Sequence, residues 1–476
     1  MKAKIAGEKR KEEARKNGAS GNRTSDDRGN RGGHQVTDRS GSRKTGAAPV
    51  KGGGSRQPAS RSSSANRSQR GIISYKILSS LFDPTRVPQD AADVIRNFDS
   101  IVYSTHPLNS KQKVLLPQQV RALSHNLTDE RSSRRLGYMN EKTALTAYVH
   151  YYMWWNLVRL VKLFSGMEES AFCLKDGDIC ADIGSGPLTV VTALLLARPE
   201  LRNKKLTWYC VDLSHDALAF GEDIFLSVAA RLGAEPWKII RVKGSVDSQL
   251  KEKCAFVTSA NVFNELHDDA DMPPDFLAKS YTGKILSFAD GTNPDARVLT
   301  IEPGDPRSAR LVSLMRDAYM RRGFVPVAPC CHCSGCPMDG KKGGKWCNFA
   351  FSTDDAPAGL KKISEKADLA KERAVLSFVL ARRGAADGTE MVGKTDAGVD
   401  GAAGSTDATL LLRIASDPIR LPGNRTGYYA CSDMGLVLFV TGKKLFSGQL
   451  IEVKRPDGKR ELALDEKSGA ILMGGD

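Results

Sequence analysis

A strand, a glycine turn and a helix follow one another over residues 177–199, and this unit constrains the fold more than any other segment. The turn reads D-I-G-S-G-P-L over residues 182–188, where Gly184 and Gly186 permit a tight bend and a close approach of a ligand to the backbone. The helix that follows offers free backbone N–H groups at its first turn. The unit therefore predicts a nucleoside-binding edge of an open α/β sheet.

The alternation of strands and helices continues after this unit. A second strand, 206–211, ends on Asp212, and an acidic residue at this place can bond the hydroxyls of a ribose. Asn264 and Glu265 follow the fourth strand, where ligand-contacting side chains can lie, although Glu265 also fits a solvent-facing helix start. We expect further strands at 237–242, 255–259, 297–301 and 324–327, and helices at 217–232 and 308–322. The pattern predicts a Rossmann-like α/β domain over residues 166–328.

Five of the ten cysteines lie within residues 329–350, among glycines and lysines. They are Cys330, Cys331, Cys333, Cys336 and Cys347. Thiolates are ligands for zinc or iron, whereas in an oxidising compartment the same residues would form disulfides. No secretory signal opens the sequence, so we expect a reducing compartment and a metal centre, with disulfides and inert buried thiols as the alternatives.

The net charge of +15 is concentrated in the first 70 residues, which hold 18 Lys or Arg against 6 Asp or Glu. Residues 1–71 have few large apolar side chains, so we expect a disordered basic tail. Such a tail could bind the phosphate backbone of RNA without sequence preference, and a solubilising role is an equal alternative. Its acidic residues argue against a mitochondrial transit peptide, because such peptides avoid acids. No apolar run reaches the roughly 18 residues of a membrane span, so no membrane association is expected.

The remaining segments predict three further parts. Residues 72–165 are expected to be a helical region, and the aromatic-rich stretch 136–164 to pack in a core rather than to stack on RNA. A helix is expected within 351–383 and a flexible linker over 384–408. Residues 409–476 predict five short strands, at 410–414, 427–431, 436–441, 450–454 and 459–464, as in a small barrel of oligonucleotide-binding (OB) type. The basic residues of this part could face either RNA or solvent: Arg413, Arg420, Arg425, Lys443 and Lys444. In the α/β domain, four further cysteines are expected to pack in a core: Cys173, Cys180, Cys210 and Cys254.

The D-x-G-x-G pattern resembles motif I of the class I S-adenosylmethionine-dependent methyltransferases, which usually have a glycine where this chain has Leu188. The resemblance implies an α/β class I methyltransferase sheet and S-adenosylmethionine as the cofactor. Residues 182–212 and Asn264 would hold it, through Asp182, Gly184, Ser185, Gly186, Asp212 and Asn264. No catalytic residue can be named, and a sheet of this type that no longer catalyses is the alternative.

Over residues 137–435 the chain has, in order, D-I-G-S-G-P, N-E-L, I-E-P-G, A-P-C-x-H-x-x-x-C-P and W-C-x-F. This order resembles the methyltransferase-like assembly factors of the small ribosomal subunit. The resemblance implies association with the small subunit or its rRNA, and a [4Fe–4S] cluster. We expect the protein to be a monomer. The ligands would be Cys330, Cys336, Cys347 and Cys431, with His332 as a hydrogen-bond partner behind them. The extra thiols Cys331 and Cys333 leave open a local zinc site made of Cys330, Cys333, Cys336 and Cys347.

The expected function is a role in ribosome assembly or translation, with two alternatives: an active rRNA methyltransferase, and a zinc-binding RNA-binding protein without enzymatic activity. A radical enzyme that uses the cluster as its reactive group is disfavoured, because the C-x₃-C-x₂-C triad of such enzymes is absent from the sequence. We expect the bacterial cytoplasm as the location, with the mitochondrial matrix second.

Overall fold

The computed structural model describes residues 73–128, 137–266, 272–341, 343–384, 408–457 and 462–474. The chain divides into two compact units, Met1–Arg67 and Ser68–Asp476, and all described residues belong to the second. The basic tail predicted for residues 1–71 and the linker predicted for 384–408, except for its two end residues, lie outside the described residues.

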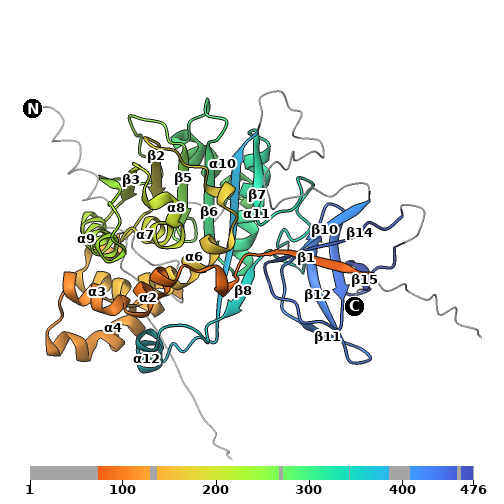
Figure 1. Cartoon of the computed structure of the whole chain (residues 1–476), viewed down its shortest axis with the longest axis horizontal. Helices are drawn as coiled ribbons and strands as arrows, with labels where there is room; N and C mark the ends of the chain where they lie inside the picture. The colour runs from red at the N-terminus through yellow and green to blue at the C-terminus, as the bar shows by residue number, and fades with distance from the viewer. Residues whose placement is uncertain are drawn as a thin grey trace, which may run out of the picture. The chain divides into compact units, whose positions relative to one another are not determined.

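An eight-stranded sheet forms the centre of the α/β domain, and its strands lie side by side in Figure 1. Its order is β4-β3-β2-β5-β6-β9-β7, with β8 paired to β9. Five strands are parallel, and β9 runs antiparallel between β6 and β7. The strands are β2 (Ile179–Ile183), β3 (Thr207–Asp212), β4 (Lys238–Lys243), β5 (Phe256–Ala260), β6 (Arg297–Pro303), β7 (Phe324–Ala328), β8 (Phe349–Ser352) and β9 (Arg373–Arg383). All six predicted strands are confirmed, and the arrangement is the open α/β sheet that the sequence predicts.

Helices cover both faces of this sheet because the parallel strands are apolar on both sides. Along β2, Cys180 packs in the core under α2, α3, α6, α7 and α9, while Ala181 and Ile183 pack in the core under α10 and α11. The helices are α2 (Gln89–Arg96), α3 (Phe98–Thr105), α4 (Ser110–Thr128), α5 (Lys142–Ala147), α6 (Trp154–Gly166), α7 (Thr189–Ala197), α8 (Pro199–Arg202), α9 (His215–Leu232), α10 (Pro274–Phe288), α11 (Pro306–Met320) and α12 (Ala358–Lys366). Among the described residues, no helix combines the length and apolarity needed to cross a bilayer.

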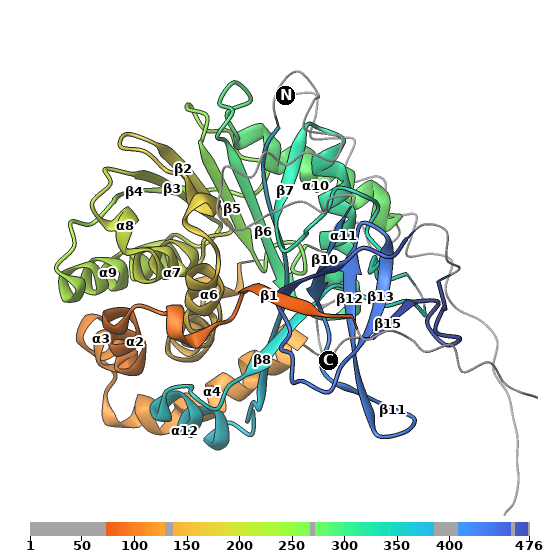
Figure 2. The same ribbon diagram turned by 45° about the vertical axis from the view of Figure 1, so that its right-hand side comes forward.

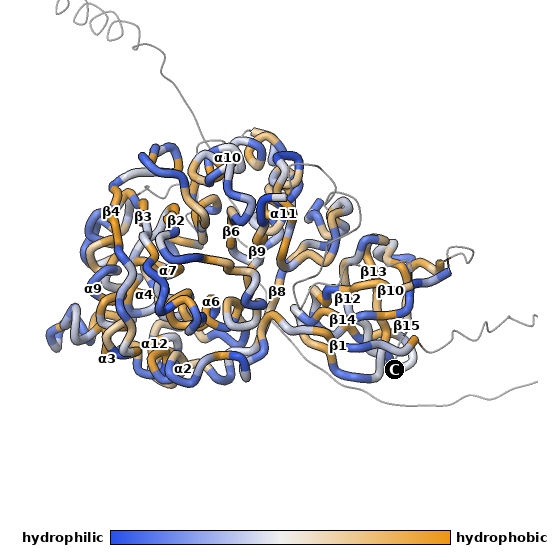
Figure 3. The backbone as a smooth tube through the Cα atoms, turned by 45° about the horizontal axis from the view of Figure 1, so that its top comes forward, coloured by the Kyte–Doolittle hydropathy of each residue, from blue (hydrophilic) through white to orange (hydrophobic). Residues whose placement is uncertain are grey.

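A second sheet is built from the C-terminal residues together with a strand from the start of the described chain. Its order is β1-β14-β10-β12-β13-β15, with β11 paired to β12, and Figure 2 shows β1 alongside the C-terminal strands. Hydrophobic residues, orange in Figure 3, gather in β10, β12 and β13. The strands are β1 (Tyr75–Ser80), β10 (Thr409–Ile414), β11 (Ile419–Leu421), β12 (Arg425–Ser432), β13 (Gly435–Val440), β14 (Gln449–Lys454) and β15 (Ile471–Gly474). Four of the five predicted strands are confirmed. Of the fifth, residues 459–461 lie outside the described residues, and within 462–464 only Leu464 forms an isolated bridge, with Ile471.

The prediction of a helical region over residues 72–165 is wrong at its start, where β1 is a strand. Ile73, Tyr75 and Ile77 alternate with polar residues at the strand period of two, and β1 pairs antiparallel with β14 as the edge strand of the second sheet. The rest of the described region is helical, and Trp154 and Trp155 are 1% and 2% exposed, as a core position requires. The apolar pattern of β1 fits both a helix and a strand, and its pairing with β14 decides for the strand.

The prediction of a helix over most of residues 351–383 is also only partly right. The charged segment forms the short α12 (Ala358–Lys366), and the chain then enters β9 (Arg373–Arg383). The residues V-L-S-F-V-L-A of β9 form a buried apolar run, which does not distinguish strand from helix by periodicity. The segment is a strand because it forms antiparallel backbone hydrogen bonds with β6 on one side and β7 on the other.

Candidate functional site: a nucleoside crevice and a cysteine cluster

The predicted cofactor residues meet at the carboxyl edge of the sheet. From β2 the chain moves outward to β3 and β4 and then returns to β5, on the other side of β2. Open α/β sheets bind their ligands at such a reversal of strand order. Gly184 and Gly186 have φ values of +67° and +51°, a left-handed conformation that favours glycine. A Cβ atom at Gly184 would lie 2.5 Å from Cγ2 of Val262, so glycine is also required for space.

Asp182 supports this crevice from within the sheet. Its side chain is 1% exposed, and its carboxyl oxygens accept hydrogen bonds from Ser185 Oγ at 2.8 Å and Thr258 Oγ1 at 2.7 Å. Burial raises the pKa of Asp182 to about 7, against these two hydrogen bonds, which lower it. Asp182 therefore joins the ends of β2 and β5 and is too deep to be the first contact of a ligand.

Asp212 holds the glycine turn from the neighbouring strand. Its Oδ2 accepts the backbone N–H of Gly186 at 2.8 Å, and its Oδ1 accepts that of Ser214 at 2.8 Å. Burial raises the pKa of Asp212, while both backbone donors oppose this shift. The carboxylate lies where a ribose is expected and is already positioned by two backbone donors. Ser214 also caps α9 and donates from Oγ to the carbonyl of Met139 at 3.1 Å.

Glu302, which the sequence analysis did not single out as a site residue, organises the loop after β5. Its buried carboxylate accepts the backbone N–H groups of Val262, Phe263 and Asn264 at 3.0, 2.9 and 3.1 Å. With its amide nitrogen turned inward, Asn264 also donates to Glu302 Oε2 at 3.1 Å and to the carbonyl of Asn261 at 2.8 Å. Burial raises the pKa of Glu302 to about 8, against the three donors. Asn264 thus lies at the crevice with its amide engaged in shaping the loop. The I-E-P-G motif, a carboxylate at the end of an apolar strand, was the available signal.

Replacing Asp182 by Asn should reduce the pH dependence of stability. Because folding raises the pKa of Asp182 to about 7, its stabilising contribution is complete near pH 4 and is lost as pH rises toward 7. We expect the free energy of unfolding of the native protein to fall between pH 5 and pH 8. In Asp182→Asn this fall should be smaller by on the order of 2 kcal/mol, measured by urea unfolding. An unchanged pH profile would mean that Asp182 is ionised throughout this range.

The cysteine segment lies against the second sheet, which brings a distant thiol to it. The Cys331 thiol lies 3.6 Å from the carbonyl oxygen of Cys431 on β12 and 3.7 Å from that of Leu411 on β10. Arg413, also on β10, donates from Nε to the carbonyl of Pro329 at 2.9 Å. The start of the segment 329–347 and the end of β12 therefore meet.

Two buried arginines surround these thiols. Arg316 is 2% exposed and donates from Nε to Cys330 Sγ at 3.2 Å, and Arg413 is 6% exposed. Although burial lowers the pKa of Arg316, the neighbouring thiol groups of Cys330 and Cys336 raise it overall. Burial raises the pKa of Cys347, with Cys336 and Cys330 acting in the same direction. The thiols are thus close enough to influence one another, in surroundings that favour a compact anion.

His332 and the remaining cysteines complete this region. Both ring nitrogens of His332 are buried and have no hydrogen-bond partner among the described residues. Burial lowers its pKa to about 4. Within the described part of the chain, no group of three or more His, Cys, Asp or Glu side chains is arranged to hold a metal ion. This holds for the local set Cys330, Cys333, Cys336 and Cys347 and equally for the predicted cluster ligands Cys330, Cys336, Cys347 and Cys431. Of the four cysteines expected in a core, three are buried and Cys173 is exposed, because it lies in the loop before β2.

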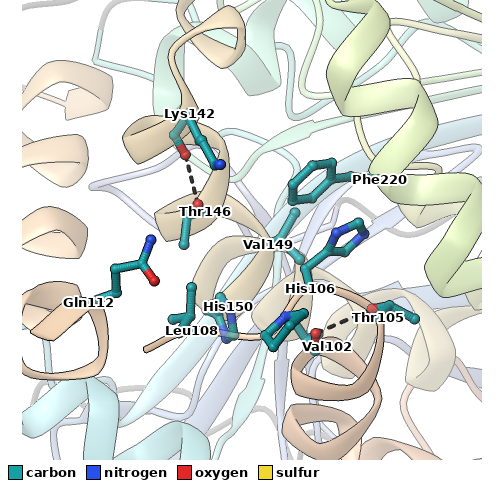
Figure 4. Close-up of a pocket in the computed structure, with 11 residues that line it drawn as sticks. Val102, Thr105, His106, Leu108, Gln112, Lys142, Thr146, Val149, His150 and Phe220 are labelled. Carbon is teal, nitrogen blue, oxygen red and sulfur yellow. Dashed lines mark hydrogen bonds between the residues drawn. The ribbon is translucent and has the colours of Figure 1, made fainter. Parts of the chain in front are cut away.

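A separate cavity of about 200 Å³ lies among the N-terminal helices and α9 (Figure 4). His106 stacks on Phe220 with 3.5 Å between ring centroids, and His150 lines the same cavity. None of the residues predicted for the cofactor or the metal lines it.

The fold is an open α/β domain with the predicted cofactor residues at the point where its strand order reverses. The profile of the family described as "Mitochondrial small ribosomal subunit Rsm22" matches residues 178–396. This range contains the glycine turn, the acidic residues of the crevice and the cysteine segment, and it ends before Cys431. A search of curated proteins found no match.

Three solved structures similar to this chain are described as methyltransferases or candidates for one. An RNA methyltransferase candidate from Pyrococcus horikoshii has 15% identity and a TM-score of 0.27, covering 49% of this chain and 86% of its own. A precorrin-6y C5,15-methyltransferase from Geobacter metallireducens has 11% identity and a TM-score of 0.28, covering 45% and 84%. A methyltransferase from Geobacter sulfurreducens in complex with S-adenosyl-L-homocysteine has 11% identity and a TM-score of 0.27, covering 48% and 90%.

Proposed function

We propose that this protein is an S-adenosylmethionine-dependent methyltransferase-like protein of the small ribosomal subunit. The observation that carries the cofactor assignment is the position of Asp212, a buried carboxylate at the end of β3 that also holds the N–H of Gly186. Bound S-adenosylmethionine would supply an electrophilic methyl group. The chain would bind the ribose through Asp212, admit the cofactor over Gly184 and Gly186, and keep the loop after β5 in place through Glu302. Transfer to a base nitrogen needs positioning more than a base, so no proton acceptor is assigned.

Replacing Asp212 by Ala should weaken S-adenosylmethionine binding by about 1.5–3 kcal/mol, because a charged hydrogen-bond acceptor is lost. Isothermal titration calorimetry with S-adenosylmethionine measures this directly. Asp216→Ala is the matched control, since Asp216 is an exposed acid in the first turn of α9 and should leave the affinity unchanged. If the native protein does not bind the cofactor, only a non-enzymatic role in the ribosome is left.

The proposed partner is the small ribosomal subunit or its rRNA. The family match over residues 178–396 and the basic composition of the first 70 residues support this proposal. Because that family is described as mitochondrial, we favour the mitochondrial matrix over the bacterial cytoplasm as the compartment. Sedimentation of a cleared lysate at low salt tests the partner, with co-migration in small-subunit fractions as the expected result. A protein that stays at the top of the gradient would contradict it.

We also propose that Cys330, Cys336, Cys347 and Cys431 hold a [4Fe–4S] cluster. Three observations support it: the mutual electrostatic influence of these thiols, the buried guanidinium groups of Arg316 and Arg413, and the unpartnered nitrogens of His332. The local zinc alternative requires Cys333 in place of Cys431, so variants of these two residues separate it from the cluster. Four protein ligands leave no open position, so the cluster would act structurally or as a redox sensor, joining the α/β domain to the second sheet.

A further inference from the structure

Tyr148, Tyr152 and Arg159 lie on one side of the continuous helical run formed by η4 (Tyr148–Met153) and α6, and we call this side the tyrosine–arginine face. η4 is a π-helical turn, a conformation that is frequent at functional sites. All three residues are half-buried, whereas most residues around them on the same helices are buried. The rings of Tyr148 and Tyr152 are nearly parallel, with centroids 5.7 Å apart. The face is thus a side of the helix that the core leaves partly uncovered.

The face begins at the cofactor crevice. Burial raises the pKa of Tyr148, and the charges of Glu265 and Asp212 act in the same direction, so its hydroxyl is within electrostatic range of both carboxylates. At the other end, Arg159 Nη1 donates to the carbonyl of Val375 at 3.1 Å, next to the carboxyl end of β6. The face therefore runs along the edge of the sheet where an acceptor must approach the methyl group.

Within the described residues, two cations at the far end have no acidic partner. Lys371 places Nζ 5.5 Å from the ring centroid of Trp155 and 5.9 Å from that of Tyr152. Desolvation of its ammonium group, and then the charge of Arg159, lower the pKa of Lys371 to about 8, although the residue as a whole is exposed. Burial also lowers the pKa of Arg159, and no carboxylate among the described residues influences either group. Two neighbouring positive charges without a counter-ion favour the binding of an anion.

We propose that the tyrosine–arginine face and Lys371 bind the acceptor as single-stranded RNA. This inference rests on the proposed function and specifies its substrate class. An unpaired base would stack on the tyrosine pair, and Arg159 and Lys371 would contact phosphates on either side of it. Duplex RNA does not fit this chemistry, because its bases already stack on one another and offer no free face.

The test compares Tyr152→Leu with Tyr152→Phe in the full chain. Fluorescence anisotropy of a labelled single-stranded oligoribonucleotide measures affinity, at raised salt so that the basic tail contributes little. Leu keeps an apolar side chain without a ring and should weaken binding about tenfold, while Phe keeps the ring and should bind like the native protein. The exposed Lys371 provides a second variant that leaves the core intact: Lys371→Gln should lower the salt dependence of log K by about 0.7.

Lys113→Gln is the matched control, because the exposed Lys113 on α4 also lies over an aromatic ring, with Nζ 4.7 Å from the ring centroid of Tyr103. Native affinity in Tyr152→Leu and an unchanged salt slope in Lys371→Gln would overturn the inference. Equal losses in Lys113→Gln, or equal affinity for duplex RNA, would also overturn it. Titration of the same samples with S-adenosylmethionine separates the two proposals. If the native protein binds the cofactor but the variants bind RNA as tightly as the native protein does, only the RNA site is refuted. If the variants lose RNA binding but the native protein does not bind the cofactor, the enzyme assignment is refuted and the RNA site is kept.

Discussion

Replacing Gly221 by Ala should abolish measurable cofactor binding and destabilise the protein. Gly221 lies in the middle of α9, and a Cβ atom there would be 2.3 Å from the carbonyl carbon and 2.6 Å from the Cα of Pro187. Pro187 belongs to the glycine turn, so the added methyl group must push either the turn or α9 outward. Overpacking of this kind costs about 1–3 kcal/mol, and the displaced turn would no longer present Gly186 to Asp212. Calorimetry with S-adenosylmethionine and urea unfolding measure the two effects.

Gly283→Ala is the control for Gly221→Ala. Gly283 also lies within a helix, α10, but a Cβ atom there would have its nearest neighbour, Arg322 Nη2, at 3.6 Å. Since alanine has the higher helix propensity, Gly283→Ala should stabilise the protein by about 0.5–1 kcal/mol and leave cofactor binding unchanged. Native cofactor affinity in Gly221→Ala would show that the turn can move without consequence, contrary to the contact described here.

The contrast between Gly221 and Gly184 shows what the sequence could predict. Gly184 belongs to a local pattern of strand, turn and helix, so its role could be inferred from neighbours in the chain. The role of Gly221 depends on a helix packing against a turn more than thirty residues away, and its only local signal was a glycine inside an amphipathic helix. Glu302 is similar, because its three backbone partners belong to another loop.

The parallel strands of the α/β domain were predictable from local sequence pattern, whereas β1 and β9 were not. The central parallel strands β2 and β5 are short runs bounded by turns, and both of their faces are largely buried. β1 and β9 became strands through pairing with distant partners, β14 in one case and β6 and β7 in the other. Local composition there was compatible with helix, so only tertiary contacts could decide.

Replacing Cys431 by Ser should release the iron and loosen the second sheet from the α/β domain. Cys431 is the one proposed ligand outside the segment 330–347, and it ends a strand whose neighbour β10 carries Arg413. Under the proposal, anaerobically purified native protein is brown and contains about four irons, whereas Cys431→Ser is colourless. Metal binding would also couple the two sheets energetically, so Cys431→Ser should unfold in two separated urea transitions instead of one.

Cys331→Ser is the sharpest control for Cys431→Ser, because Cys331 lies at the same contact, 3.6 Å from the carbonyl oxygen of Cys431, without being a proposed ligand. It should retain iron and the single transition. A second control, Cys333→Ser, tests the local zinc alternative, which requires Cys333 and not Cys431. One zinc per chain, lost in Cys333→Ser and kept in Cys431→Ser, would refute the cluster and leave the two sheets joined only by contacts such as that between Arg413 and Pro329. Loss of iron in Cys331→Ser but not in Cys431→Ser would keep the cluster and exchange one ligand, since both thiols lie within reach of the same guanidinium group.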